Sequence, residues 1–393
     1  MRFLILNTDY PEFLLWLYSQ HPELENRSYQ EQMQTRNESL FGVADFYSEN
    51  LRKLGHEAWE IHANNEFMQK AWAREMGMRI GTIASSKQRW QRAMKRARGA
   101  AALTPLRYIK PLIAPILGSP NSVRHWFNDI LAAQIRYCRP DVLLNQAMDS
   151  ISASFLAKMK PHVRLLMGQI AAPLPKEENL RCYDLIVSSL PNFVRYFRRM
   201  GVPAELHRLA FEPRVISKLG NRESKISISF VGSLSSKHQS RIHLLEYLCE
   251  HLDLEVWGQG VDSLPENSWI RRRYKGKAWG INMYRILFNS KTTLNHHVDI
   301  AESYANNMRL FEATGVGTLL VTDWKENLHE MFELNKEVVV YRNPKECAEL
   351  IQYYLDHDQE RQEIARAGQE RTLRNHTYYQ RMQDLAEIVG KYL

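Results

Sequence analysis

Residues 306–323, NNMRLFEATGVGTLLVTD, pass from a short helical pattern straight into a buried strand and so decide the class of fold. Apolar residues surround Glu312 at helical spacing, and Gly315 and Gly317 are expected to end that helix. The run Thr318–Val321 then predicts a buried strand. A helix that passes through glycine into such a strand is typical of α/β proteins with parallel sheets.

The same alternation begins at the N-terminus. An apolar strand at Phe3–Leu6 precedes a polar loop, a predicted helix over 38–54 and a second strand at Ala58–Ile61. Four further strand-like segments follow, with helical stretches between them: Asp141–Leu144, Val163–Met167, Asp184–Val187 and Ala204–Leu209. This order favours a parallel sheet that helices cover on both faces.

A second series starts at the strand 226–231, ISISFV, and continues with a helix from about 239 to 251. We expect its further strands among the apolar segments Leu254–Trp257, Tyr284–Phe288, Thr292–Asn295 and Val338–Tyr341. Periodicity breaks at 212–222, where Pro213 and Gly220 lie, so we place the join between two domains there. Two doubly wound, Rossmann-like domains in tandem are the simplest α/β interpretation.

The composition is that of a soluble globular chain. It has 393 residues, of which 44% are hydrophobic and 24% charged, and no uninterrupted apolar run reaches the ~20 residues of a membrane span. The opening apolar run, 2–6, is too short for a secretion signal, so we expect a cytoplasmic protein. The four cysteines are scattered, which argues against a zinc site or a disulfide framework.

Positive charge is concentrated in 70–139, which holds 14 Lys or Arg against Glu75 and Asp129. Within this expected helical insertion, Ser85–Arg98 (SSKQRWQRAMKRAR) has a narrow apolar stripe that includes Trp90. Such a helix can lie on an anionic membrane surface, or it can pack its stripe on the domain and remain solvated. Nucleic-acid binding is a third interpretation, disfavoured because no nucleic-acid module accompanies the charge.

The strand 226–231 runs into a turn that suits anion binding. Gly232 and Ser233 follow the strand, and backbone N–H groups with Lys237 or Arg241 could hold a phosphate there. Many strand-to-helix turns contain Gly-Ser for steric reasons alone, and the glycine spacing fits neither the dinucleotide fingerprint nor the P-loop.

Glu312 and the pair His296–His297 each allow a purely structural interpretation as well as a functional one. Glu312 could accept hydrogen bonds from a vicinal diol such as a ribose, although a solvent-facing glutamate or one paired with Arg309 is commoner. His296 and His297 follow a predicted strand, but adjacent side chains on an extended segment point to opposite faces, so joint metal ligation is disfavoured. His297 could pack in the core or contact a ligand.

Five motifs in order resemble the carboxyl-terminal half of group 1 glycosyltransferases, with the CgeB-like (spore maturation protein B-like) branch the most similar. They are Phe230-Val231-Gly232-Ser233, Trp257-Gly258-Gln259-Gly260, Tyr274-Lys275-Gly276, Arg309-Leu310-Phe311-Glu312-Ala313 with Gly315 and Gly317, and His376-Thr377-Tyr378. The resemblance covers 226–390 and extends more weakly to Tyr183–Ile186 and Ala210–Pro213.

The resemblance implies a GT-B architecture with two Rossmann-like domains facing a central cleft. The acceptor domain would comprise 1–215, the nucleotide-sugar donor domain 216–375, and a terminal helix, 376–393, would cross back to the first domain. Glu312 would bind the ribose and Gly232 the diphosphate or sugar. The expected donor contacts are Gly232, Ser233, Lys237, Arg241, Tyr274, Gly276, His297, Asn307, Arg309 and Glu312.

GT-B enzymes need no bound metal, so no cofactor is expected, and Lys237, Arg241 and Arg309 would stabilise the diphosphate. Many retaining members carry an acid eight positions before the ribose glutamate. That position is Tyr304 here, and the nearest acid is Glu302. The inference about the sugar end and about stereochemistry therefore stays open.

In the first domain, Asp9 follows the first strand and is expected to act as the base if the reaction inverts the anomeric centre. An Asp before Tyr-Pro is also ordinary turn chemistry. Asp149 and Gln169 are further candidates on that side. The expected function is metal-independent transfer of a sugar, with UDP as the expected nucleotide, to a glycan, lipid-linked or other cell-envelope acceptor. The alternatives are a nucleotide-sugar epimerase on the same scaffold and a non-catalytic membrane- or nucleic-acid-associated protein.

Overall fold

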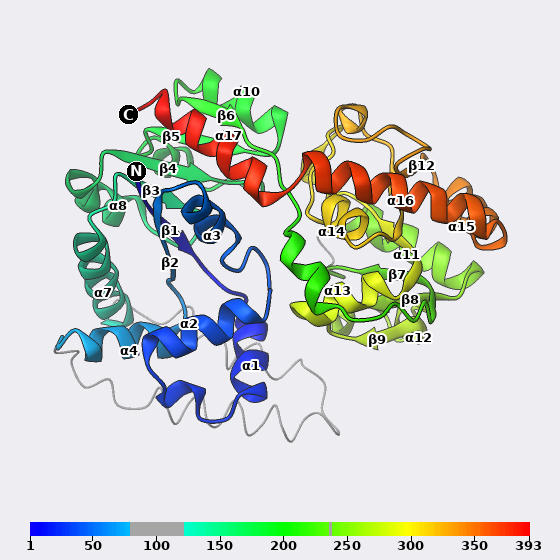
Figure 1. Ribbon diagram of the computed structural model, residues 1–393, viewed down its shortest axis with the longest axis horizontal. Helices are drawn as coiled ribbons and strands as arrows, with labels where there is room; N and C mark the ends of the chain where they lie inside the picture. The colour runs from blue at the N-terminus through cyan, green and yellow to red at the C-terminus, as the bar shows by residue number, and fades with distance from the viewer. Residues whose placement is uncertain (79–121, 236–237) are drawn as a thin grey trace. The chain divides into compact units, whose positions relative to one another are not determined.

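The computed structural model describes residues 1–78, 122–235 and 238–393, with the side chains of 122–126 left aside. Within these residues the chain forms two six-stranded sheets (Figure 1). Two compact units account for the described contacts. One comprises Met1–Ser39, His56–Gln169 and Pro175–Asp184, and the other Leu40–Gly55, Ile170–Leu174 and Leu185–Leu393.

The first sheet has the strand order β2-β1-β3-β4-β5-β6 and parallel pairing. Its strands are β1 (Arg2–Asn7), β2 (Glu57–His62), β3 (Val142–Asn145), β4 (Leu165–Gln169), β5 (Leu185–Ser188) and β6 (Ala204–Leu206). All four residues of β3 and of β5 are buried. Central strands of a parallel sheet are apolar throughout because helices cover both faces, which explains why these segments show no alternation.

The helical elements up to the end of the first sheet are α1 (Pro11–Gln20), η1 (Leu24–Asn26), α2 (Tyr29–Glu38), α3 (Phe46–Lys53), α4 (Glu66–Glu75), α7 (Ser122–Cys138), α8 (Ala153–Met159), η3 (Lys160–His162), α9 (Glu177–Leu180) and α10 (Pro191–Arg199). Helix α2 begins with a capping box, in which the Ser28 side chain accepts from the backbone of Glu31 and the Glu31 side chain accepts from Ser28.

The second sheet has the order β12-β11-β10-β7-β8-β9, also with parallel pairing. Its strands are β7 (Ile226–Val231), β8 (Leu254–Trp257), β9 (Tyr274–Gly276), β10 (Ser290–Asn295), β11 (Leu319–Asp323) and β12 (Val339–Tyr341). The order reverses at β7, and such a switch point is where open α/β sheets place their ligands, at the carboxyl ends of the strands.

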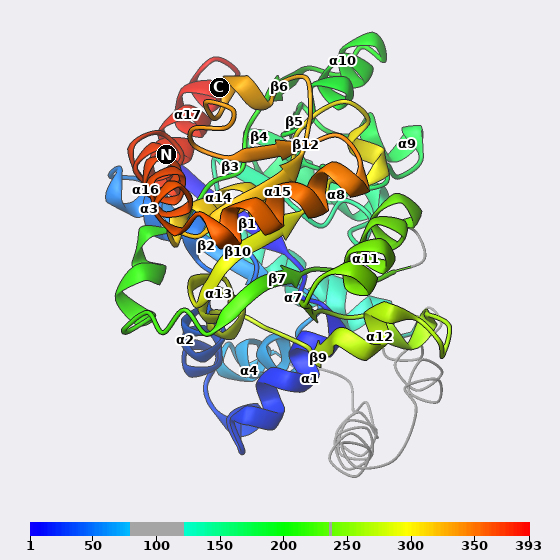
Figure 2. The ribbon, with the colours of Figure 1, turned by 90° about the vertical axis from the view of Figure 1, so that its right-hand side faces the viewer.

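Helices cover both faces of this sheet. The helical elements that follow β6 in the chain are η4 (Pro213–Lys218), α11 (Gln239–His251), η5 (Val261–Ser263), α12 (Trp269–Arg273), α13 (Ile281–Phe288), η6 (Asp299–Ala301), α14 (Arg309–Gly315), η7 (Leu328–Glu330), α15 (Pro344–Asp356), α16 (Asp358–Asn375) and α17 (Tyr378–Gly390). Helices α11, α12 and α15 pack on one face (Figure 2), and α13, α14 and α16 pack on the other.

Three local expectations from the sequence are wrong. The helix over 38–54 is interrupted at 39–45, where Leu40, Gly42 and Ala44 have positive φ, so only Phe46–Lys53 forms α3. The apolar segment Tyr284–Phe288 is the end of helix α13 and not a strand.

The third correction concerns the two glycines after Glu312. Gly315 is the last residue of α14, and only Gly317, with φ +75°, takes the left-handed conformation that ends a helix. A side chain at Gly315 would meet the ring of Phe211, since an added Cβ would lie 2.3 Å from a ring carbon. Gly315 therefore allows close packing, while Gly317 allows the turn.

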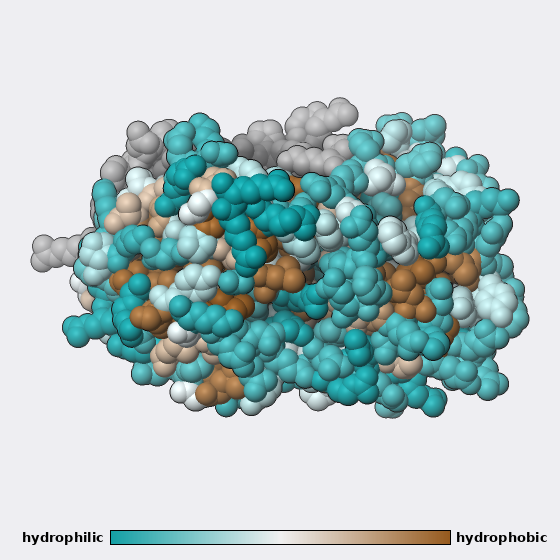
Figure 3. Space-filling model, turned by 90° about the horizontal axis from the view of Figure 1, so that it is seen from above, coloured by the Kyte–Doolittle hydropathy of each residue, from teal (hydrophilic) through white to brown (hydrophobic). Residues whose placement is uncertain are grey.

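The terminal helix α17 packs against α3 within one unit. The ring of Tyr378 contacts Phe46 and Tyr47, with centroids 5.1 and 5.6 Å apart. Phe211 pairs with the segment just before α17, because its N–H donates to the carbonyl of His376 and its carbonyl accepts from Tyr378. Large exposed apolar side chains are scattered, and the face in Figure 3 shows hydrophobic residues in separate areas among hydrophilic ones.

Candidate functional site

Three neighbouring strands of the second sheet end at one edge. β7 ends at Val231, β10 at Asn295 and β11 at Asp323, and all three run parallel. The residues after them are the Gly232 turn, the His296–His297 pair and Trp324. Since ligands of open α/β sheets bind beyond this edge, we build the candidate site there.

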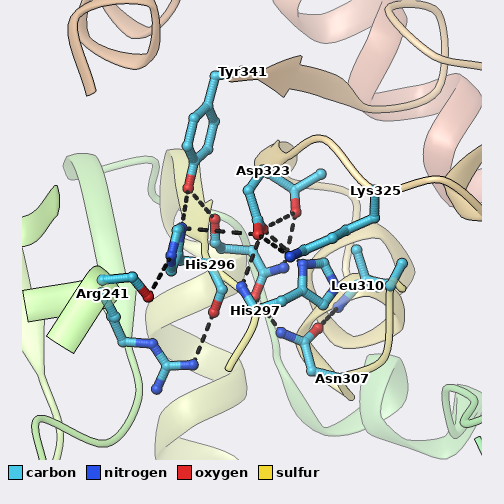
Figure 4. Close-up of polar contacts among 12 residues, drawn as sticks. Arg241, His296, His297, Asn307, Leu310, Asp323, Lys325 and Tyr341 are labelled. Carbon is cyan, nitrogen blue, oxygen red and sulfur yellow. Dashed lines mark hydrogen bonds and ion pairs between the residues drawn. The ribbon is translucent and has the colours of Figure 1, made fainter. Parts of the chain in front are cut away.

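Helix α14 is fixed to this edge by a chain of amides. Asn307 accepts from the backbone N–H of Leu310 at 3.3 Å and donates to the Oδ1 of Asn295 at 2.6 Å (Figure 4). Asn295 in turn donates to Thr322 Oγ1 at 2.9 Å. The first turn of the helix, which carries the predicted donor residues, is thereby held against the ends of β10 and β11.

Glu312 is buried and paired with Arg309. The Nη1 of Arg309 lies 2.8 Å from Glu312 Oε2, although Nη1 makes no directed hydrogen bond, and Arg309 Nη2 donates to the carbonyl of Val231 at 3.0 Å. Burial raises the pKa of Glu312, and Arg309 and a hydrogen bond from Tyr284 oppose that rise. The pairing with Arg309, which the sequence suggested as the alternative to ribose binding, is present. It is buried and lies directly beside the end of β7.

The Gly232 turn is held by a close approach of two backbones. Gly232 N–H donates to the carbonyl of Trp257 at 3.0 Å, and an added Cβ on Gly258, at φ +149°, would lie 1.7 Å from the Gly232 oxygen. Tyr274 and Gly276 support the same loop, because the Tyr274 hydroxyl donates to the Gly258 carbonyl at 2.7 Å and the Gly276 carbonyl accepts from Gly258 at 2.9 Å. The predicted residues Tyr274 and Gly276 thus shape the turn in this structure.

Arg241 bridges two loops of the site. Its guanidinium donates to the carbonyls of Ser233, at 3.2 Å, and His296, at 2.8 Å. Burial lowers the pKa of Arg241, with the charge of Asp323 acting in the opposite direction. The predicted residue Lys237 lies outside the described residues, as do Ser85–Arg98.

Asp323, which was not predicted from the sequence, lies close to both histidines. Its Oδ1 lies 2.6 Å from His297 Nδ1 and accepts from the His297 N–H at 3.0 Å, while His296 Nδ1 lies 3.9 Å from Oδ2. The two adjacent histidines thus approach different oxygens of one carboxylate. Lys325 Nζ lies 3.5 Å from the same carboxylate. The position of Asp323, the last residue of a buried strand, was the available signal.

Asp9 lies just beyond the carboxyl end of β1 in a buried ion cluster. Arg36 Nη2 lies 2.6 Å from Asp9 Oδ1, and His62 Nδ1 lies 3.2 Å from Oδ2. Burial would raise the pKa of Asp9, but Arg36 and His62 outweigh burial and lower the pKa below its usual range. Asp9 is thus held as a carboxylate by two neighbours, which makes it a weak proton acceptor here.

Amide side chains line the same edge of the first sheet. Asn7 donates to Gln146 at 3.1 Å, and Gln146 donates to Gln169 at 2.9 Å. These residues lie at the ends of β1, β3 and β4, so they offer polar groups along the strand ends where an acceptor is expected. Asp149 is exposed and accepts from Ser150. Glu302, the nearest acid to the position of Tyr304, is also exposed.

Several solved structures share the fold of this chain. Anabaena HepE in complex with UDP-glucose is similar at 12% identity, with a TM-score of 0.56 and 100% of both chains covered. The chain has the GT-B fold. A glycosyltransferase from Rickettsia africae ESF-5 shares 13% identity (TM-score 0.55; 100% of this chain, 98% of that one). Sucrose-phosphate synthase from Thermosynechococcus elongatus shares 10% (TM-score 0.55; 100% and 99%).

Residues 240–387 of this GT-B chain match the family model described as glycosyl transferase-like. The matched residues include the site from Arg241 to Lys325. The predicted fold class is confirmed, and the family-model match supports the predicted glycosyltransferase character. No curated protein sequence matches the chain. In the described ranges, no helix has the length and hydrophobicity that crossing a membrane requires, and no group of three His, Cys, Asp or Glu is placed to hold a metal ion.

Proposed function

We propose that this protein transfers a sugar from a nucleotide-sugar donor, with UDP as the nucleotide, to a glycan, lipid-linked or other cell-envelope acceptor, within the CgeB-like branch. The observation that carries the proposal is the buried Glu312, which lies in the first turn of α14, within the glycosyl transferase-like residues. Similarity of fold to a protein crystallised with UDP-glucose supports the choice of nucleotide.

On the donor side, the carboxylate of Glu312 accepts from the two ribose hydroxyls. The ion pair with Arg309 lacks a directed hydrogen bond, so an oxygen of Glu312 has remaining acceptor capacity. Tyr274 and Gly276 would shape the region of the base, and the Gly232 turn with Ser233 and Lys237 would face the diphosphate. Arg309, with Arg241 keeping the loops in place, supplies positive charge without a metal.

On the acceptor side, Asp9 would act on the hydroxyl that attacks the sugar. Its cluster with Arg36 and His62 means that Asp9 acts as a base only if acceptor binding separates it from those cations. The basic segment Ser85–Arg98 would bring the enzyme to an anionic membrane surface and so to a lipid-linked acceptor at the inner face.

A thermal-shift screen tests the donor side. The chain is incubated with UDP, GDP, ADP, CMP and the corresponding nucleotide sugars, with and without EDTA. Ligand at about 100 times its dissociation constant adds about 2.7 kcal/mol of stability. We expect UDP and a UDP-sugar to raise the transition equally with and without EDTA.

If no nucleotide raises the temperature of the unfolding transition, the proposed function is wrong. If EDTA abolishes the rise, the proposed metal independence is wrong. Turnover of the nucleotide sugar without an acceptor to an isomeric sugar would indicate the epimerase alternative. Salt-sensitive binding to anionic vesicles or nucleic acid, with no nucleotide bound, would indicate a non-catalytic protein.

A further inference from the structure

His297 has one ring nitrogen fixed and one without a partner. Nδ1 lies 2.6 Å from Asp323 Oδ1, and the backbone N–H of His297 donates to the same oxygen at 3.0 Å. The side chain is fully buried, and its Nε2 has no hydrogen-bond partner among the described residues. The two contacts place a proton on Nδ1 and fix the ring, so Nε2 is the nitrogen left for a ligand.

The neighbouring His296 gives the internal contrast. Its Nδ1 lies 2.9 Å from the hydroxyl of Tyr341 and its Nε2 lies 3.2 Å from Ser240 Oγ (Figure 4). Both nitrogens of His296 are therefore used within the protein. Two adjacent histidines share one carboxylate, yet only His297 keeps a nitrogen without a partner.

Asp323 is a fixed negative charge beside His297. Burial would raise the pKa of Asp323, but His297, His296 and Lys325 together lower it, so the carboxylate stays ionised. A phosphate oxygen at Nε2 would be a second acceptor, so a ring bound between the carboxylate and the phosphate donates from both nitrogens.

The position of His297 matches an anionic ligand. It follows β10 by two residues, next to the end of β11 and one strand from the Gly232 turn that ends β7. A buried ring nitrogen without a partner is costly in a folded protein, and a phosphate group at this edge would supply one.

We propose that His297, held by Asp323, donates a hydrogen bond from Nε2 to a phosphate oxygen of the nucleotide donor, with Asp323 as its positioning residue. This inference rests on the proposed function, because it requires a nucleotide donor. It goes further by assigning the diphosphate contact to a histidine whose ring is held in place by the carboxylate of Asp323.

The test compares a ligand with phosphates and one without. Binding of UDP-glucose and of uridine is measured by calorimetry at one pH for the whole chain and for His297→Gln, Asp323→Asn and the matched control His296→Gln. The other charged or titratable groups facing the pair are His296, Lys325, Arg241 and Tyr341.

We expect His297→Gln to weaken UDP-glucose binding about tenfold and to leave uridine binding unchanged, as loss of a charge-assisted hydrogen bond requires. Asp323→Asn should also weaken UDP-glucose binding without affecting uridine, and His296→Gln should keep the wild-type affinity for both. His297→Asn, with thermal unfolding of each variant, is the second substitution if glutamine does not fold.

Equal UDP-glucose affinity in wild type and His297→Gln would overturn the proposed contact while the proposed function stands. A parallel loss of UDP-glucose and uridine would overturn it too, because the residue would then be structural. If the wild-type chain binds neither UDP-glucose nor uridine, the UDP-dependent function is overturned and this contact with it.

Discussion

Arg309 and Glu312 form a buried ion pair, with arginine Nη1 2.8 Å from glutamate Oε2, and the same guanidinium donates to the carbonyl of Val231. The acidic residue proposed to bind ribose is therefore joined to the end of β7. A substitution at Glu312 consequently changes both a ligand contact and a structural pair, and the two effects have to be measured separately.

Glu312→Gln is the sharper substitution for binding. Glutamine keeps the shape of the side chain but loses the charge-assisted bonds to the ribose, so we expect about tenfold weaker UDP binding by calorimetry. Glu312→Ala leaves Arg309 buried without a counter-charge and should cost about 3–5 kcal/mol in unfolding free energy. Unchanged UDP affinity in the folded glutamine variant would contradict the ribose role.

Gly258→Ala should destabilise the chain by more than about 4 kcal/mol, because the methyl group would lie 1.7 Å from the Gly232 oxygen at a backbone φ of +149°. Gly201, with φ +77° and nothing within 4 Å of an added Cβ, is the matched control. Its alanine variant should lose only about 1–2 kcal/mol. Urea unfolding of both variants makes the comparison, and similar losses would disprove the close approach.

Stability should fall as the pH is lowered from 7 to 5, in part through His207. This residue is buried, its ring nitrogens lack hydrogen-bond partners among the described residues, and burial lowers its pKa to about 3. The unfolded chain therefore takes up a proton below about pH 6.5 that the folded chain does not, and folding free energy is lost in that range.

At pH 5 the His207 contribution is about 2 kcal/mol. In His207→Phe the decline between pH 7 and 5, followed by urea unfolding, should be smaller by that amount. His376, whose pKa burial lowers to about 4, leaves a residual decline. The exposed His243 is the control. If replacing His243 reduces the loss of unfolding free energy between pH 7 and 5 and replacing His207 does not, the assignment to His207 is wrong.

The terminal helix α17 should contribute strongly to stability. Leu385 is fully buried on the helix, and Gln383, two residues earlier, is exposed. Leu385→Ala should cost about 2–5 kcal/mol and Gln383→Ala close to nothing, as measured by the midpoint of thermal or urea unfolding. Equal effects would mean that α17 does not pack as described.

Strand positions were the most predictable part of the fold. Largely buried strands such as Ile226–Val231 can be recognised from their composition, and glycine after a helix marks the return to the sheet. The interruption of the predicted helix at Leu40 and Ala44 could not be predicted. Non-glycine residues rarely adopt positive φ, and no sequence pattern marks those that do. Tyr284–Phe288 is too short for periodicity to separate a strand from a buried helix.

Within the candidate site, Glu312 and Arg309 could be found because motif order points to them, whereas the only signal for Asp323 was its position at the end of a buried strand. Its contact with His297 joins residues 26 positions apart, and only the parallel register of β10 and β11 brings them together. The ion cluster of Asp9 with Arg36 was hidden for the same reason. Long-range charge pairing leaves no local pattern in a single sequence.

The contact between Gly315 and the Phe211 ring gives this protein a built-in spectroscopic reporter. The glycine lies against the aromatic ring where no side chain fits, so the magnetic field of the ring must displace the resonance of its α-proton. Because Gly315 is the last residue of α14, which carries Glu312, a movement of α14 on nucleotide binding would alter that displacement. Ligand occupancy could then be followed at a native residue, without attaching a label.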